Sequence, residues 1–210
     1  VVSVAGGSRD ITLRAGAVRN WGGDGVDALN ASNSQFQDLR LSFNAANGLY
    51  GGANSTVVNC TATSNGTHGI FAGVGSTIYG CTTHANGITG IVADKGSAVR
   101  GSTGTSNSGN GIFAGEGGTI VDCTARANGD KGIAMEKKGL VLNGAAVLNG
   151  NEGIYGGDDS TVRDCSAHNN GQGIRVGPRG TVTGCTASSN NGNGITVGES
   201  SRVADCTASL

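Results

Sequence analysis

Apolar residues recur along this chain with a period of about 21 residues. The clearest set of equivalent positions, called a column below, holds an aliphatic residue at Val26, Leu49, Ile70, Ile91, Ile112, Ile133, Ile154, Ile174 and Ile195. The intervals between these positions are 23, 21, 21, 21, 21, 21, 20 and 21 residues. A fixed period of 20 to 50 residues is typical of proteins built from stacked repeats.

Three further columns keep the same period. The first holds Val57, Ile78, Val99, Ile120, Val141, Val162, Val182 and Val203. The second holds Leu39, Cys60, Cys81, Ser102, Cys123, Gly144, Cys165, Cys185 and Cys206. The third holds Asn44, Asn65, Asn86, Asn107, Asn128, Asn149, Asn170 and Asn190. Four columns in register predict that equivalent residues of successive repeats lie on top of one another.

Within each repeat, short runs such as "GIFAG", "TVV" and "CTA" alternate between inward and outward positions. In the first run we expect Ile70 and Ala72 to point inward and Phe71 to point outward. A period of two is typical of strands with one buried face. Gly, Asn and Asp bound the runs and tolerate turn conformations. We therefore predict an all-β parallel solenoid of about nine coils, each with three short strands and three bends and no helix.

We expect residues 1–210 to form one solenoid domain. Residues 1–25, which include Trp21, are the least regular, so we expect an irregular first coil or a cap there. The chain ends with "DCTASL" within a repeat, which suggests truncation in the middle of a coil. It has no initiator Met and no signal peptide, so we expect a trimmed or excised N-terminus.

Composition narrows the classes of partner. The chain has 210 residues, 40 of them Gly, a single Pro and a net charge of -1. This near-neutral balance gives no electrostatic reason to expect binding to nucleic acid or to an anionic membrane. No run of about 18 apolar residues occurs, so we predict no membrane span.

The repeat "GI-x-[VA]-G…[ST]-x-[VI]-x-[DNG]-C-[TS]-A-x-x-N" resembles the right-handed parallel β-helix of pectate-lyase-like proteins, over roughly residues 20–210. The opening "RDITLRAGAVRNWGGDGV" is similar to the first coil of uncharacterised bacterial members. The resemblance implies a right-handed helix. It implies no single activity, because the superfamily includes lyases, hydrolases, epimerases, adhesins and tailspikes, and function must be argued from the site.

The cysteine and asparagine columns have structural interpretations. Cys60 and Cys81 lie one coil apart, close enough to bridge, whereas Cys123 has no cysteine neighbour in its column. We expect at least one free thiol, and Cys acting mainly as a small core residue. No metal site is predicted. The Asn column predicts stacked amides that bond along the rod, left-handed turn conformations, or both.

Aromatic residues occupy part of the outward column that follows each Ile. We predict that Tyr50, Phe71, Phe113 and Tyr155 bind ligand. Phe71, Phe113 and Tyr155 would stand two coils apart, roughly 10 Å, which is near the repeat of a disaccharide. In the family that the repeat resembles, this strand face commonly forms the substrate groove. The alternative interpretations are an interface between subunits and an unspecialised surface.

Charged residues follow in the next turn. The column with Lys95, Glu116, Lys137 and Asp158 alternates in sign, as does the neighbouring one with Lys138, Asp159 and Arg179, which predicts an exposed ladder of ion pairs. The alternative is an active site. Its weak catalytic candidates are Glu136, Lys138, Asp158, Asp159, Arg175 and Arg179.

Each enzyme class would use these candidates differently. A lyase would need a base, for which Arg175 or Lys138 is the candidate, and a cation such as Ca²⁺ for the uronate carboxylate. A hydrolase would need two carboxylates, for which Glu136 and Asp158 are the candidates. No other cofactor is expected, and His68, His84 and His168 are too scattered to form a site.

Two functions remain open. The first is a non-catalytic rod, located outside the cell, on its surface or in the periplasm, that binds polysaccharide or associates with itself through its aromatic face or its open ends. The second is a polysaccharide-active lyase, hydrolase or epimerase with its site on the outer face of coils six to eight. The intervals between repeats are uniform, so no repeat has a long loop that could form the wall of a cleft. The sequence therefore favours the non-catalytic rod.

Overall fold

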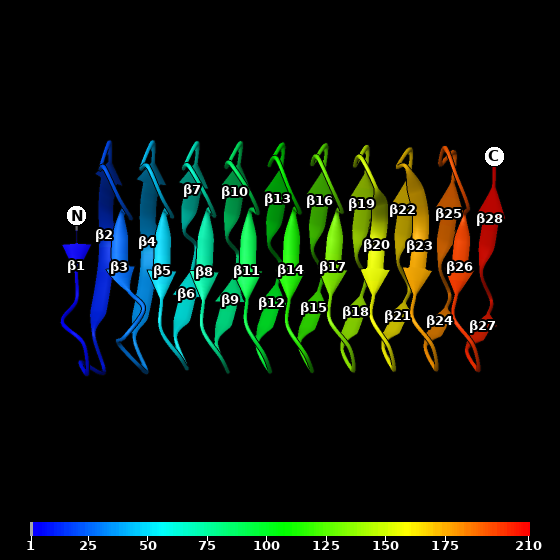
Figure 1. Ribbon diagram of the computed structural model, residues 1–210, viewed down its shortest axis with the longest axis horizontal. Coiled ribbons are helices and arrows are strands. Elements are labelled where there is room, and N and C mark those ends of the chain that lie inside the picture. The colour runs from blue at the N-terminus through cyan, green and yellow to red at the C-terminus, as the bar shows by residue number, and fades with distance from the viewer. Residues whose placement is uncertain (1) are drawn as a thin grey trace.

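The chain coils into a straight rod in which each coil stacks on the one before (Figure 1). The structure is a computed structural model that describes residues 2–210. It contains 28 strands joined by turns and bends. Along residues 2–210 there is no helix with the length and apolar character needed to cross a membrane.

One side of the rod is a sheet of ten parallel strands. In spatial order they are β1 (Val2–Ser3), β3 (Val26–Ala28), β5 (Leu49–Gly51), β8 (Ile70–Ala72), β11 (Ile91–Ala93), β14 (Ile112–Ala114), β17 (Ile133–Met135), β20 (Glu152–Gly156), β23 (Gln172–Val176) and β26 (Ile195–Val197). Each strand comes from a different coil, so the rod has about ten coils of roughly 21 residues.

The other two sides belong to one sheet of eighteen strands that bends around the rod. Its members are β2 (Thr12–Arg19), β4 (Gln35–Ser42), β6 (Thr56–Val58), β7 (Thr61–Thr63), β9 (Thr77–Tyr79), β10 (Thr82–His84), β12 (Ala98–Arg100), β13 (Thr103–Thr105), β15 (Thr119–Val121), β16 (Thr124–Arg126), β18 (Leu140–Leu142), β19 (Ala145–Val147), β21 (Thr161–Arg163), β22 (Ser166–His168), β24 (Thr181–Thr183), β25 (Thr186–Ser188), β27 (Arg202–Ala204) and β28 (Thr207–Ser209). The long strand β4 pairs with both β6 and β7 and thus spans both sides.

The predicted columns form the core. Ile91 pairs in register with Ile70 on one side and with Ile112 on the other, and all three side chains are buried. Val99 pairs likewise with Ile78. Stacking identical or similar side chains fills the narrow interior without voids, because each coil presents the same shape to the next. The predicted all-β parallel solenoid is confirmed.

The Asn column is a hydrogen-bonded ladder. The Oδ1 atom of Asn86 accepts hydrogen bonds from the backbone N–H of Asn65 at 3.0 Å and from its Nδ2 at 3.0 Å. The prediction of stacked amides is confirmed. The prediction of left-handed conformation at these residues is wrong, because the positive φ belongs to the residue before each Asn, as at Ser64 (55°) and Ala85 (52°). The ladder thus supplies hydrogen-bond partners to the buried amide groups of the bend.

All six cysteines are free thiols, and five of them are buried. Their role goes beyond filling space, because the Sγ atom of Cys81 accepts a hydrogen bond from the backbone N–H of Cys60 at 3.4 Å. Cys185 stands in the same relation to Cys165. Burial raises the pKa of the Cys123 thiol to about 11, which keeps it protonated at neutral pH. The expectation of at least one free buried thiol is confirmed.

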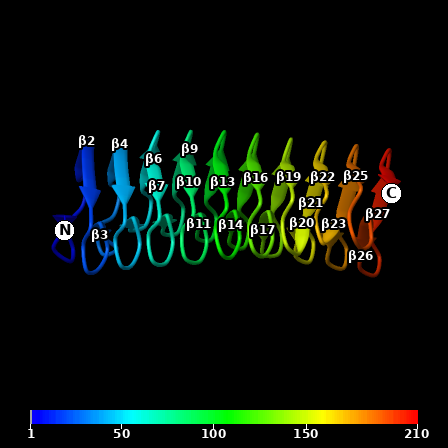
Figure 2. The ribbon, with the colours of Figure 1, turned by 90° about the horizontal axis from the view of Figure 1, so that it is seen from above.

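Short turns give the rod an even outline. Seen from above, the turns of successive coils lie in a row, and no loop stands out from it (Figure 2). Any ligand-binding feature must therefore be made by side chains on the flat outer faces and by the turns beside them.

Candidate functional site

The outer face of the ten-stranded sheet carries the predicted aromatic column. Tyr50 pairs in register with Phe71, and Phe71 with Val92. Further along, Ala134 pairs with Phe113 on one side and with Tyr155 on the other. All four predicted ligand-binding aromatics thus lie on one face, in two groups separated by Val92.

The first group is a compact cluster. The rings of Tyr50 and Phe71 meet edge to face, with centroids 4.8 Å apart and planes at 83°. The ring of His68 lies 6.4 Å from that of Phe71. The Nδ1 atom of His68 accepts a hydrogen bond from the backbone N–H of Thr89 at 3.3 Å. The rings of Tyr50 and Phe71 therefore pack against each other.

The second group borders a shallow hollow of about 330 Å³. Its lining residues are Phe113, Met135, Glu136, Lys137, Tyr155, Gly157 and Asp158. Two of these are rings from coils that are two steps apart, and three are charged residues of the turns that follow β17 and β20. Ala134, which lies in register between the two rings, is only 2% exposed and does not line the hollow. Of the predicted catalytic candidates, Glu136 and Asp158 border this hollow.

The charged turn beside the hollow forms two clusters. Glu116 lies 3.1 Å from the Nζ atom of Lys138 and 3.8 Å from that of Lys137. Arg179 donates two hydrogen bonds to Asp159, at 2.7 and 2.9 Å. A hydrogen bond from Lys138 lowers the pKa of Glu116. The hydrogen bond from Arg179 lowers the pKa of Asp159 in the same way.

The predicted coil-by-coil ladder is therefore only partly right. Of its first column, Glu116 pairs with Lys137, Asp158 pairs only outside the column, and Lys95 forms none of the ion pairs in residues 2–210. Arg179 also approaches Asp158 diagonally, at 3.8 Å. Lys138, Asp159 and Arg179 share positive φ, at 61°, 57° and 58°, so the backbone of this column is regular. Lys138 and Arg179 reach the neighbouring column because their side chains are long.

Glu152 and Lys131 are site residues that the sequence analysis missed. They belong to a polar column two residues before each core Ile, which holds Asp24, Asn47, His68, Thr89, Asn110, Lys131, Glu152, Gln172 and Asn193. The Glu152 side chain is only 4% exposed and lies near two cations, Lys131 and Arg175. The available signal was a pair of opposite charges in adjacent coils of an otherwise mostly uncharged column.

The Lys131 ammonium also lies over the Tyr155 ring, 5.7 Å from its centroid. Tyr155 is therefore shared between the hollow and this charged cluster. Arg175, a predicted catalytic candidate, pairs in register with Tyr155 on the following strand. Ring, cations and hollow together form one continuous surface on coils six to eight.

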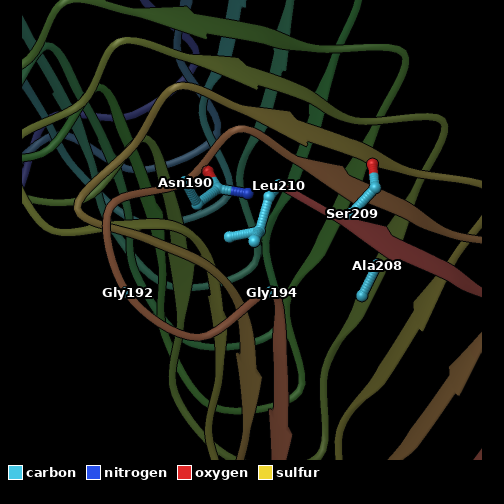
Figure 3. A pocket seen from close by; sticks show the side chains of 6 residues that line it. All are labelled: Asn190, Gly192, Gly194, Ala208, Ser209 and Leu210. Carbon is cyan, nitrogen blue, oxygen red and sulfur yellow. The ribbon is translucent and has the colours of Figure 1, made fainter.

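Other parts of the rod have fewer candidate functional groups. Within residues 2–210 no three His, Cys, Asp or Glu side chains come together as a metal site would require. His84 and His168 bond to Thr105 and Ser188 of the next coil. A second hollow, of about 180 Å³, lies at the last coil (Figure 3). It is lined by Asn190, Gly192, Gly194, Ala208, Ser209 and Leu210, none with an ionisable side chain.

Comparison with known proteins places these features in a family. Residues 2–121 and 113–208 match the family described as the right handed beta helix region. No curated protein matches the sequence.

Solved structures show the same architecture. The A-module of the mannuronan C-5 epimerase AlgE6 from Azotobacter vinelandii superposes with a TM-score of 0.73 and 19% identity, over 99% of this chain and 68% of that one. The A-module of AlgE4 from the same organism gives 0.65 and 14%, over 98% and 75%. The pectate lyase Pel9A gives 0.50 and 16%, over 97% and 67%. At these identities the likeness shows the fold alone.

Proposed function

Because this chain belongs to the right-handed β-helix family, we propose that it is a non-catalytic module that binds an extended anionic polysaccharide along the outer face of its ten-stranded sheet. The observation that carries the proposal is the hollow of about 330 Å³ bordered by Phe113, Tyr155 and the turns that follow β17 and β20, with Lys137 in its lining. The proteins of similar fold named for mannuronan and pectate agree with a ligand of this class.

The spacing of the rings suits a sugar chain. Phe113 and Tyr155 lie two coils apart, which is roughly 10 Å along the rod. An extended polysaccharide repeats over a similar length for every two sugar units. The apolar face of one sugar unit would stack on each ring, and its hydroxyls would reach the polar side chains of the turn. Sites for small ligands are commonly apolar surfaces with a few placed polar groups.

The charges favour an acidic chain over a neutral one. Lys137 lines the hollow, and Lys131 and Arg175 flank Tyr155 on the same face. Mannuronan and pectate are chains of uronic acid units, each with a carboxylate. Hydrogen bonds between Lys or Arg and a carboxylate are about twice as strong as those between neutral groups. A ligand of this kind occurs outside the cytoplasm, so we propose the same location for the protein.

Two features support binding without catalysis. The turns are uniformly short, so no loop closes over the hollow to exclude water, as catalysis by desolvation requires. The acidic candidate Asp159 accepts two hydrogen bonds from Arg179, which lower its pKa. A carboxylate held in an ion pair is a poor proton acceptor because its charged form is stabilised.

Isothermal titration of the purified chain with mannuronan and pectate oligomers tests the proposal, with a neutral glucan of equal length as the control. We expect saturable binding of an acidic oligomer and none of the glucan. Chromatography and NMR of the recovered oligomers would reveal cleavage or epimerisation. Chemical change of the oligomers would refute the non-catalytic assignment. Absence of binding together with a larger mass by light scattering would replace it with self-association.

A further inference from the structure

Glu152 is a charged residue in a place where charge is costly. The residue begins strand β20, is 3% exposed, and lies on the outer side of the ten-stranded sheet next to Tyr155. The following residue, Gly153, packs on the Asn ladder, where a Cβ would come within 2.5 Å of Asn170 Nδ2. A buried carboxylate is tolerated only where cations or hydrogen-bond donors compensate it.

Two cations compensate Glu152, one at each oxygen. Its Oε1 atom accepts a hydrogen bond from Arg175 Nη1 at 3.4 Å. Its Oε2 atom lies 3.7 Å from Lys131 Nζ and has no hydrogen-bond partner. Both contacts are long for a stabilising buried ion pair, and such pairs repay their desolvation only with good geometry. The arrangement therefore needs a reason other than stability.

The positions of Lys131 and Arg175 suggest what the buried carboxylate does. Lys131 comes from the coil before Glu152, and Arg175 comes from the coil after it. Tyr155 lies between them, with Lys131 Nζ 5.7 Å from its ring centroid and Arg175 next to it in register. One buried carboxylate thus ties a cation to each side of the ring on which a sugar unit would stack.

We propose that Glu152 is a positioning residue, which holds Lys131 and Arg175 on either side of Tyr155 so that they meet the carboxylates of successive sugar units. The inference rests on the proposed function, since it assigns a role within the same binding face. Without the carboxylate, nothing holds the two like charges, which stand two coils apart on either side of the ring, and their flexible side chains move into solvent. The two cations would then attract an acidic chain only by general electrostatics, without contacting particular carboxylates.

The substitution Glu152→Gln tests this because the two explanations predict opposite signs. It keeps the shape and removes one negative charge near a polyanion, so simple charge balance predicts tighter binding of an acidic oligomer. Loss of positioning predicts binding about tenfold weaker, as for the removal of one partner from an organised charge cluster. Glu199→Gln makes the same charge change at an exposed residue that forms none of the ion pairs in residues 2–210, and we expect it to leave affinity within twofold.

A second measurement works whether or not any glycan binds. The Tyr155 ring should shift the Lys131 side-chain protons upfield in the NMR spectrum, and we expect this shift to collapse in Glu152→Gln. If Glu152→Gln melts early, Glu152→Asp decides the matter, because it keeps the negative charge but shortens the reach to Lys131. We expect the upfield shift to fall in this variant as well.

The outcomes separate the two claims. A wild-type chain that binds no acidic oligomer overturns the proposed function, and the NMR shift then decides the positioning role alone. A persistent shift in both variants, or tighter binding by Glu152→Gln, overturns the positioning role and leaves the binding function standing.

Discussion

The two aromatic groups on the outer face share one column but differ in what lies between their rings. Tyr50 and Phe71 stand on adjacent coils and pack against each other at 4.8 Å. Phe113 and Tyr155 are separated by a coil whose outward residue is Ala134, and the surface beside them is hollow. In this chain, therefore, rings on adjacent coils pack against each other, whereas rings two coils apart border a hollow.

The polar surroundings of the two groups differ in the same sense. Near the first, Asp24, Asn47 and His68 are joined by hydrogen bonds, such as that from Asn47 Nδ2 to Asp24 Oδ1 at 2.9 Å. Near the second, the same column holds Lys131 and Glu152, whose charges are only loosely paired. Closed hydrogen-bond networks rigidify a surface, whereas loosely paired charges are available to a partner.

The double variant Phe113→Ala/Tyr155→Ala should show the largest effect. If these rings are the anchors of the bound chain, affinity for an acidic oligomer should fall by about 30-fold or more, as for central aromatic anchors in other interfaces. Both side chains are partly exposed, so we expect little change in melting temperature. Titration calorimetry and thermal unfolding measure the two quantities.

The matched control for that variant is Tyr50→Ala/Phe71→Ala, which makes a similar loss of aromatic surface in the other group. We expect this control to keep affinity within about threefold, because the packed pair offers no hollow, and to lower the melting temperature. Equal loss of affinity in both variants would contradict the distinction between the two groups and would extend the ligand over the whole face.

Ala134→Phe should disturb the two rings of the second group. Ala134 is only 2% exposed, so a ring at this position would displace the side chains of Phe113 and Tyr155, which pair with it in register. We expect affinity to fall by about tenfold and stability to fall as well, because overpacking a buried position costs about 1–3 kcal/mol. Ala134→Ser, which adds only one oxygen, is the control and should bind as the wild type does. Undiminished binding by the Phe variant would show that the hollow is not the site.

The fold was predictable because the interior repeats. Strand pairing puts equivalent residues of each coil in contact, so each coil needs the same kind of residue at the same place. The pattern therefore recurs about nine times in the sequence, as in the column from Val26 to Ile195. Even the Asn ladder was foreseeable from an amide at equal intervals. The one error there, the position of the left-handed residue, arose because Ser64 and Ala85 tolerate that conformation without being typical of it.

The outer face could be predicted less well because its residues do not repeat. The alternation of strands placed Phe113 and Tyr155 on this face, but not the packing that separates them from Tyr50 and Phe71. Glu152 was missed because its surroundings depend on the long side chains of Lys131, one coil earlier in its own column, and of Arg175, which belongs to a different column. Ion pairs between long side chains depend on rotamers and on diagonal reach, which spacing along the chain does not specify.

A double-mutant cycle can quantify the first group. If Tyr50 and Phe71 stabilise each other as an edge-to-face pair, the cycle Tyr50→Ala, Phe71→Ala and both should give a coupling of about 1 kcal/mol in the free energy of unfolding. The same cycle on Phe113 and Tyr155 should give a coupling near zero, because Ala134 keeps those rings apart. Unfolding in urea measures both cycles. Equal coupling energies in the two cycles would contradict the difference in ring packing between the two groups.

The smallest expected effect concerns the pH dependence of stability near the first group. Burial lowers the pKa of His68 in the folded chain, and its Nδ1 atom must be unprotonated to accept the hydrogen bond from Thr89. The unfolded chain has the ordinary histidine pKa of about 6.5. Above pH 7.5 His68 is neutral in both states and contributes no pH dependence. As the pH falls through 6.5, the unfolded state takes up a proton that the folded state resists, so the free energy of unfolding decreases.

His68→Gln should remove this part of the pH dependence, because glutamine offers an oxygen to the Thr89 amide and does not titrate. The quantity to compare is the change in the free energy of unfolding between pH 7.5 and pH 5.5, measured in urea for both proteins. We expect a steeper decrease in the wild type, since only there does protonation of the unfolded state compete with folding. Parallel curves would mean that His68 takes up its proton as readily in the folded chain, and that the first group is as open to water as the second.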